Sequence, residues 1–213
     1  MTRKIASLGF SIAAFVLGLS ATRNAHAVDY YRAGKVSVSL ERVFGLHYWH
    51  TSVERANPLN GDDVSSGTVI GIGWYGARSP YHWGRAAVDG FIIDRLSLGG
   101  SIGFYSQSGD ADGSGFLIYP RVGYVIPISN VFSFWPRGGF SYMHFENTSP
   151  AGGDGGLFGF AAEAMFVASP SDDWHILFGP TLDFGFAGSR NDDDRDFTHF
   201  TIGFPAVGLM GTF

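Results

Sequence analysis

FLIYPRVGYVIPISNVFSFWPRGGFSY (residues 116–142) is the stretch of this chain that decides its fold. It reads as two strands joined by the turn formers Pro127, Ser129 and Asn130. Side chains of opposite character alternate along both strands, which is the period of β-structure. One face carries large apolar side chains, namely Phe116, Ile118, Val122, Tyr124, Ile126, Phe132, Phe134, Phe140 and Tyr142.

The other face of the hairpin carries its charges and its smallest residues. Arg121 and Gly123 lie on that face in the first strand, and Arg137, Gly139 and Ser141 in the second. A broad apolar face opposite a polar face of small residues is what an outer-membrane barrel needs, with lipid outside and polar groups inside. The hairpin alone is also compatible with a soluble barrel or sandwich.

The N-terminus favours an exported protein. Arg3 and Lys4 precede an apolar run from Ile5 to Leu19, and a small-x-small pattern ends at Ala27. This combination predicts a secretory signal peptide over residues 1–27, cleaved after Ala27, and a mature barrel domain over 28–213. A membrane anchor is the alternative, but the run is shorter than the ~20 residues that a spanning helix needs.

Composition excludes several classes of function. The chain has no cysteine, so it has neither disulfides nor thiol chemistry. Three of its 14 lysines and arginines lie in the signal peptide and none of its 19 acids does, which leaves the mature chain near −8. Nucleic acid is therefore not an expected partner. The 31 glycines and 20 phenylalanines suit a barrel with an aromatic outer surface and a tightly packed interior.

Further alternating segments complete an all-β, antiparallel, up-and-down transmembrane barrel. They cover residues 36–50, 96–106, 157–168 and 174–187, followed by a last strand that ends at Phe213. Residues 66–94 are ambiguous, because they form either one broken strand or two. Polar loops and short turns alternate along the chain, which places both termini at one end and demands an even number of strands. We therefore expect eight strands, with 66–94 as a single descending passage.

Two changes of phase predict β-bulges. Arg42 falls on the apolar face of the first strand, and a bulge near residues 41–43 would turn it inward. The last strand switches faces between Phe204 and Val207, which predicts a bulge at Pro205 and Ala206.

The chain resembles the small outer-membrane β-barrel family grouped with OmpA, OmpX and OmpW. The resemblance rests on the signal peptide, the terminal Phe213 and the segment GFIIDRLSLGG (90–100). It also rests on two aromatic-Pro-Arg-x-Gly-aromatic segments, at 119–124 and 135–140. It implies a Gram-negative outer-membrane location and contact with membrane lipids and lipopolysaccharide. It also implies monomeric insertion by the barrel assembly machinery, through the strand ending at Phe213.

The candidate site is a charge network inside the barrel, made of Glu41, Asp89, Arg121, Arg137, Glu163 and Asp183. Five of these residues lie about five positions from the periplasmic end of their strands, which is roughly 13 Å and near mid-membrane. Buried arginines need nearby acids. Pairing Ile126 with Phe132 would place Arg121 directly opposite Arg137, so we expect an acid beside each. The network is either a plug, or a selectivity ring or proton path, and a narrow eight-stranded barrel favours the plug.

The function expected is a non-enzymatic barrel with a plugged interior, in a structural or surface-contact role or with very limited permeation. A lipid A-modifying enzyme and a small-solute channel are the alternatives. His47, His50, His144 and Glu146 are the residues from which an enzyme would be built, but they form no catalytic spacing. The acidic loop at 110–114 lacks the distal glutamate of a calcium loop. The acidic loop at 192–196 is compatible with a divalent ion shared with lipopolysaccharide phosphates, but a solvated loop is the favoured interpretation. No catalytic residue, metal or cofactor is therefore assigned.

Overall fold

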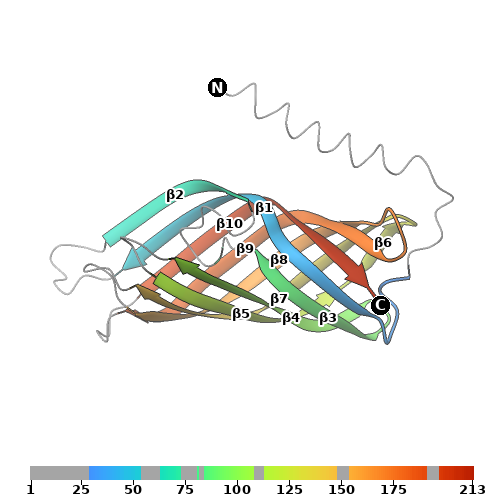
Figure 1. Cartoon of the computed structure of the whole chain (residues 1–213), viewed down its shortest axis with the longest axis horizontal. Helices are drawn as coiled ribbons and strands as arrows, with labels where there is room; N and C mark the ends of the chain where they lie inside the picture. The colour runs from blue at the N-terminus through green and yellow to red at the C-terminus, as the bar shows by residue number, and fades with distance from the viewer. Residues whose placement is uncertain are drawn as a thin grey trace, which may run out of the picture.

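Ten antiparallel strands wrap into a closed barrel in the computed structural model (Figure 1). The structure describes residues 29–53, 63–72, 81, 84–107, 113–147, 154–190 and 197–213. The strands are β1 (Val36–Val53), β2 (Asp63–Ile72), β3 (Arg85–Ile93), β4 (Leu96–Gln107), β5 (Gly113–Tyr124), β6 (Ile126–Ser129), β7 (Phe132–Asn147), β8 (Gly155–Ala168), β9 (Trp174–Arg190) and β10 (Phe197–Thr212). β10 pairs with β1 and closes the barrel. No helix among the described residues is long and apolar enough to cross a membrane. The predicted all-β, up-and-down barrel is confirmed.

The ten strands make eight passages across the barrel. β2 pairs with one half of β1, where Phe44 lies opposite Ile72, and β3 pairs with the other half, where Leu40 lies opposite Ala86. The two are therefore halves of one broken descending passage, as predicted. β6 is a short segment of the β5–β7 hairpin and adds no passage. Among the described residues, β2 pairs with β1 alone, and residues 103–107 of β4 pair with β5 alone.

The first strand begins and the last strand ends at the same end of the barrel, which we call the inner end. The amide of Phe213 donates to the Val36 carbonyl at 2.9 Å, and the amide of Val36 donates to the Phe213 carbonyl at 3.2 Å. The two-residue turn at Asp94 and Arg95 is tied to the same end, because the Arg95 amide donates to the Tyr31 carbonyl at 2.7 Å. At the opposite end, which we call the outer end, β1, β4, β7 and β9 end and β2, β5, β8 and β10 begin.

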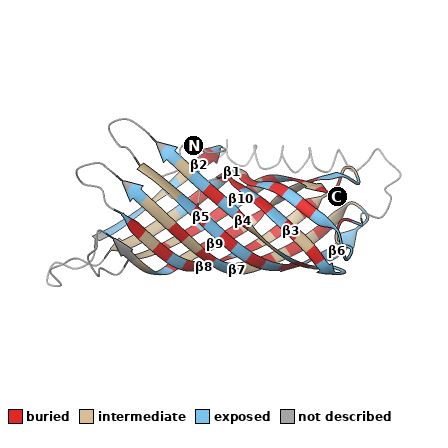
Figure 2. Ribbon diagram, turned by 60° about the horizontal axis from the view of Figure 1, so that its bottom comes forward, coloured by how far each residue is buried: buried red, intermediate tan, exposed pale blue. Residues whose placement is uncertain are grey.

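The outward side chains of the barrel wall are mostly apolar, and the inward side chains are buried. Along β5, the outward Ile118 and Val122 are 42% and 50% exposed, whereas the inward Tyr119 and Arg121 are 0% and 2% exposed. Buried residues alternate with less buried ones in this way along most of the wall (Figure 2). Water strongly disfavours so continuous an apolar surface, and a lipid bilayer accommodates it.

Both predicted bulges are present. The β1–β10 register shifts between Leu40 and Phe44, and there Arg42 adopts a left-handed φ of 55° that turns its side chain into the barrel. A left-handed conformation is unfavourable for a residue with a Cβ, so contacts made by the side chain must offset it. The β9–β10 register shifts between Gly203 and Ala206, which accounts for the change of face along the last strand.

The predicted register of the β5–β7 hairpin is wrong by two residues. Arg121 pairs with Gly139, not with Arg137, and Arg137 pairs with Gly123. The turn is tighter than predicted, because β6 continues the ladder and Ser129 lies opposite Phe132. Alternation allowed either register, since a two-residue shift keeps every side chain on its face.

The strand prolines lie beside gaps in the ladders. Pro120 pairs with Gly100 on β4, but the β5–β7 ladder skips Tyr119 and Pro120. The β8–β9 ladder likewise skips Pro180. Pro136 pairs with Ala164 on β8, and the ladder on its other side skips it between Phe134 and Arg137. Because proline has no N–H, a gap on one side of the strand is the expected cost.

Candidate functional site in the barrel lumen

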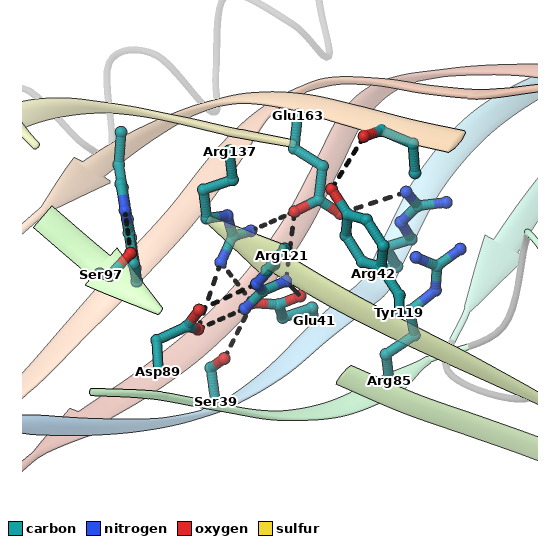
Figure 3. A network of polar contacts seen from close by, with 12 residues as sticks. Ser39, Glu41, Arg42, Arg85, Asp89, Ser97, Tyr119, Arg121, Arg137 and Glu163 are labelled. Atoms are coloured by element: carbon teal, nitrogen blue, oxygen red, sulfur yellow. Dashed lines mark hydrogen bonds and ion pairs between the residues drawn. The ribbon is translucent and has the colours of Figure 1, made fainter. Parts of the chain in front are cut away.

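Four arginines and four acids meet at mid-height in the lumen (Figure 3). They are Arg42, Arg85, Arg121 and Arg137 with Glu41, Asp89, Glu163 and Asp183, and none is more than 3% exposed. The formal charges balance. Burial of an ion is tolerated only when partners satisfy it, so the arrangement of pairs determines whether this network stabilises the barrel.

Arg121 is the centre of the group nearer the inner end. Its two terminal nitrogens contact the two oxygens of Glu41 at 2.7 and 2.8 Å, and its Nε donates to Asp89 at 3.0 Å. Arg137 reaches Glu41 at 2.6 Å and Glu163 at 2.7 Å. Two-pronged arginine–carboxylate contacts of this kind are directional as well as strong.

Arg42 is the centre of a second group, nearer the outer end. It donates to both oxygens of Asp183, at 2.6 and 3.1 Å, and to Glu163 at 3.2 Å. Arg85 contacts the same Asp183 at 3.2 Å. The carbonyl of Tyr81 accepts from Arg42 at 2.6 Å. Glu163 therefore bridges the two groups, one oxygen facing each.

Glycines make room for these long side chains. Asp89 pairs with Gly99, Gly99 with Arg121, and Arg121 with Gly139, so charged and glycine residues alternate around the wall. A Cβ on Gly99 would lie 2.6 Å from the Asp89 Cα, and one on Gly139 would overlap the Pro120 carbonyl oxygen. Neither backbone atom can easily move aside, so both positions require glycine.

Apolar layers cover the network on both sides. The inner layer consists of Tyr30, Phe91, Val125, Trp135, Met165, Val167, Leu177 and Met210. The outer layer consists of Tyr81, Leu117, Tyr119, Met143, Leu157 and Ala161. Both layers exclude water from the ion pairs, which strengthens each pair and raises the cost of any charge left without one.

The inner layer is completed by a residue that precedes the first strand. Tyr30 turns into the inner end of the barrel, where its ring lies 6.0 Å from that of Phe91 and 4.8 Å from that of His175. Its hydroxyl is hydrogen-bonded to Ser133, and burial raises the pKa of that hydroxyl. The Gly34 amide donates to the Phe91 carbonyl at 2.8 Å and holds the segment in place.

All six residues predicted from the sequence lie in this network, and each of its arginines has a carboxylate within 3.3 Å. Sequence reasoning missed Arg42 and Arg85 as members. Arg85 lies four residues before the inward Asp89, an even spacing that puts both on one face of a strand, so alternation could have indicated that Arg85 faces the lumen. Tyr30 and Tyr81 lie outside the strands, and no alternation signals them.

The histidines considered for catalysis do not gather at one place on the lipid boundary. His47 is fully buried and faces the lumen. His144 is on the outer surface, 3.4 Å from Glu146. In the described part of the chain, no group of three or more histidine, aspartate or glutamate residues could hold a metal ion. The acidic positions 110–112 and 192–196 lie outside the described residues.

No protein-family model and no curated protein matches the sequence. Solved structures do resemble it. The N-terminal β-barrel domain of Pseudomonas aeruginosa OprF matches 85% of this chain and 98% of its own, with 12% identity and a TM-score of 0.49. Neisserial surface protein A matches 84% and 99%, with 10% identity and a TM-score of 0.49. Ail, the attachment invasion locus protein of Yersinia pestis, matches 85% and 99%, with 14% identity and a TM-score of 0.41. The strand pairing of this chain by itself establishes the closed antiparallel barrel of eight passages.

Proposed function

We propose that this chain is a non-enzymatic barrel of the Gram-negative outer membrane whose own side chains plug its interior. The observation that carries the proposal is that buried side chains fill the lumen in three successive layers. These are the inner apolar layer, the ion network and the outer apolar layer. An eight-stranded barrel has an interior about as wide as its side chains can fill. Its role is then structural or one of surface contact, with at most very limited permeation.

The ion network supports the plug electrostatically. A permeating ion would have to separate fully buried pairs such as Arg121–Glu41 at 2.7 Å and Arg42–Asp183 at 2.6 Å. Separating such a pair leaves two buried charges without partners, which is strongly unfavourable. A selectivity ring would instead present charges of one sign to a wet lumen.

The outside of the barrel supports the expected partners. The outward apolar side chains fit membrane lipids, and we expect the outer end of the barrel to meet lipopolysaccharide. Phe213 is 76% exposed at the end of β10, where that strand meets β1. An exposed aromatic side chain at this position is accessible for binding by the barrel assembly machinery. We propose that this machinery inserts the chain into the outer membrane as a monomer.

Planar bilayer recording tests the plug. Purified protein, with insertion confirmed by slower gel migration after boiling, should leave the conductance of the bilayer at its background level. Stable open pores in that preparation would exclude the plugged interior. Incubation of the same preparation with radiolabelled lipid A should release no labelled fragment, and release would support the enzyme alternative.

A small-solute channel is the second candidate, and one observation favours it. Towards the outer end, and within the described residues, β2 is paired on one side only, and so are residues 103–107 of β4. An apolar solute could use a seam in the wall without passing the ion network. Uptake of an apolar solute by vesicles that contain the protein, together with background ion conductance, would distinguish this candidate from the plug.

A further inference from the structure

A short segment that precedes the first strand lies across the inner end of the barrel. Residues 29–35, which we call the strap, are attached to β3 and to the turn that follows it. The hydrogen bonds of this attachment are 2.7–2.9 Å long and link Gly34 and Lys35 to Phe91, Tyr31 to Arg95 and Ala33 to the Asp94 carboxylate. The strap is therefore anchored on one side of the barrel, by the hairpin of β3 and β4.

Tyr30 reaches from the strap to the opposite side. In the closed ring of eight passages, β8 lies diametrically opposite β3, and β7 and β9 flank β8. The Tyr30 hydroxyl is hydrogen-bonded to Ser133 on β7, and its ring lies 6.3 Å from that of Trp135 on β7 and 4.8 Å from that of His175 on β9. Tyr30 is 2% exposed, whereas Tyr31 is partly buried and the other five residues of the strap are exposed. The contact of the strap with the far wall therefore depends mainly on one side chain.

Tyr30 is the first of a series of side chains that leads from the inner end to the ion network. Trp135 lies next to it, and its Nε1 donates to the Ser97 hydroxyl at 3.2 Å. The guanidinium carbon of Arg137, which belongs to the ion network, lies 4.7 Å from the Trp135 ring. Withdrawal of Tyr30 would therefore admit water to the inner apolar layer, up to the side chains that adjoin the network.

The strap has the properties of a segment that opens locally. Its backbone lies at the surface and it buries little apolar area apart from Tyr30, whereas the wall is held by ladders of backbone hydrogen bonds. Gly34 has a left-handed φ of 86°, and a Cβ there would meet nothing within 4 Å. Conformation, and not packing, therefore favours glycine at the point where the strap meets its anchor.

We propose that the strap is a movable cap of the inner end. It opens about Gly34, withdraws Tyr30 from the lumen and admits water to the inner apolar layer while the eight passages stay paired. The junction of β1 and β10 does not need the strap, because Val36 and Phe213 hold each other through two backbone hydrogen bonds. The cap is separate from the plugged interior, since the ion network lies behind it and determines conductance whether the cap is open or closed.

Thiol labelling tests the cap, because the chain has no cysteine and a single introduced one reports on its own position. Val167→Cys places the thiol in the inner apolar layer on β8, at a fully buried site. In detergent micelles, a charged water-soluble thiol reagent should label it slowly without urea, as followed by mass spectrometry. The rate should rise little with urea below the unfolding midpoint, because local opening exposes little surface. Leu157→Cys, in the outer layer, provides a matched buried thiol that the cap does not cover.

Variants of the strap should change the labelling of Val167→Cys alone. Gly34→Ala should raise its rate about tenfold, because a left-handed conformation is unfavourable for alanine in the closed cap. Tyr30→Ala should raise it ~100-fold or more. Arg32→Gln, at an exposed position of the strap, should leave it unchanged. Neither Gly34→Ala nor Tyr30→Ala should alter the labelling of Leu157→Cys.

Two outcomes would overturn the proposal. The first is labelling of Val167→Cys with the full urea dependence of global unfolding, as measured by gel mobility, and this test needs no variant of the strap. The second is an equal rise in labelling at Val167→Cys and Leu157→Cys in Gly34→Ala, or no rise at either, because the strap would then not move separately from the barrel.

Discussion

Glu163→Gln should destabilise the barrel more than any change of an exposed charge. Glu163 lies within 2.7 Å of Arg137, 3.3 Å of Arg121 and 3.2 Å of Arg42, and so joins the two halves of the ion network. Glutamine keeps the shape of the side chain and removes its charge. The change therefore isolates the electrostatic contribution from the packing.

The magnitude follows from the number of partners. Two unit charges about 4 Å apart interact by ~4 kcal/mol at an effective dielectric constant of 20. Removing one partner of a buried pair typically costs ~3–5 kcal/mol, because the remaining charge keeps its desolvation penalty. Glu163 faces three arginines, so we expect a loss within that range for Glu163→Gln.

Reversible unfolding by urea in lipid vesicles, followed by tryptophan fluorescence and by gel mobility, measures this loss. Asp29→Asn is the matched control, because its partner Arg32 is 64% exposed and the pair is at the surface. Exposed pairs contribute ~0–1 kcal/mol. If the two variants lost equal stability, the network would contribute packing and not charge.

Three further changes test the wall and the inner layer. Phe178→Arg on the lipid side should cost ~2–4 kcal/mol of folding stability in vesicles. The control Trp174→Arg, near the inner end, should cost ~0–1 kcal/mol. Equal stabilities of the two variants would mean that the outward facing assigned to Phe178 on β9 is wrong. Gly139→Ala should cost ~1–3 kcal/mol, because its Cβ would lie 2.8 Å from the Arg121 Cα. Gly138→Ala should be nearly neutral in the same unfolding assay, since its nearest contact is 3.7 Å, and a larger loss there than at residue 139 would contradict the register. Tyr30→Ala should lower stability by ~3–5 kcal/mol by opening the inner layer, and an unchanged urea midpoint would show that this layer seals without it.

The sequence by itself determined the class of fold, the facing of the strands and the number of passages. These properties are local. Alternation assigns Phe116 and Ile118 to the lipid and Arg121 to the lumen, and the changes of phase at Arg42 and at Pro205 indicate the bulges. Strand parity, which requires both termini at one end, then selected eight passages.

Only the tertiary structure decided the register and the pairing of charges. Alternation is unchanged by a shift of two residues, so it could not choose between Arg137 and Gly139 as the partner of Arg121. The contact of Arg42 with Asp183 joins residues 141 positions apart, on strands whose mutual placement depends on how the barrel closes. Tyr30 and Tyr81 enter the lumen from segments outside the strands, where no periodic pattern indicates direction. Facing is a property of each strand alone, whereas contact across the lumen depends on the register and stagger of all eight passages together.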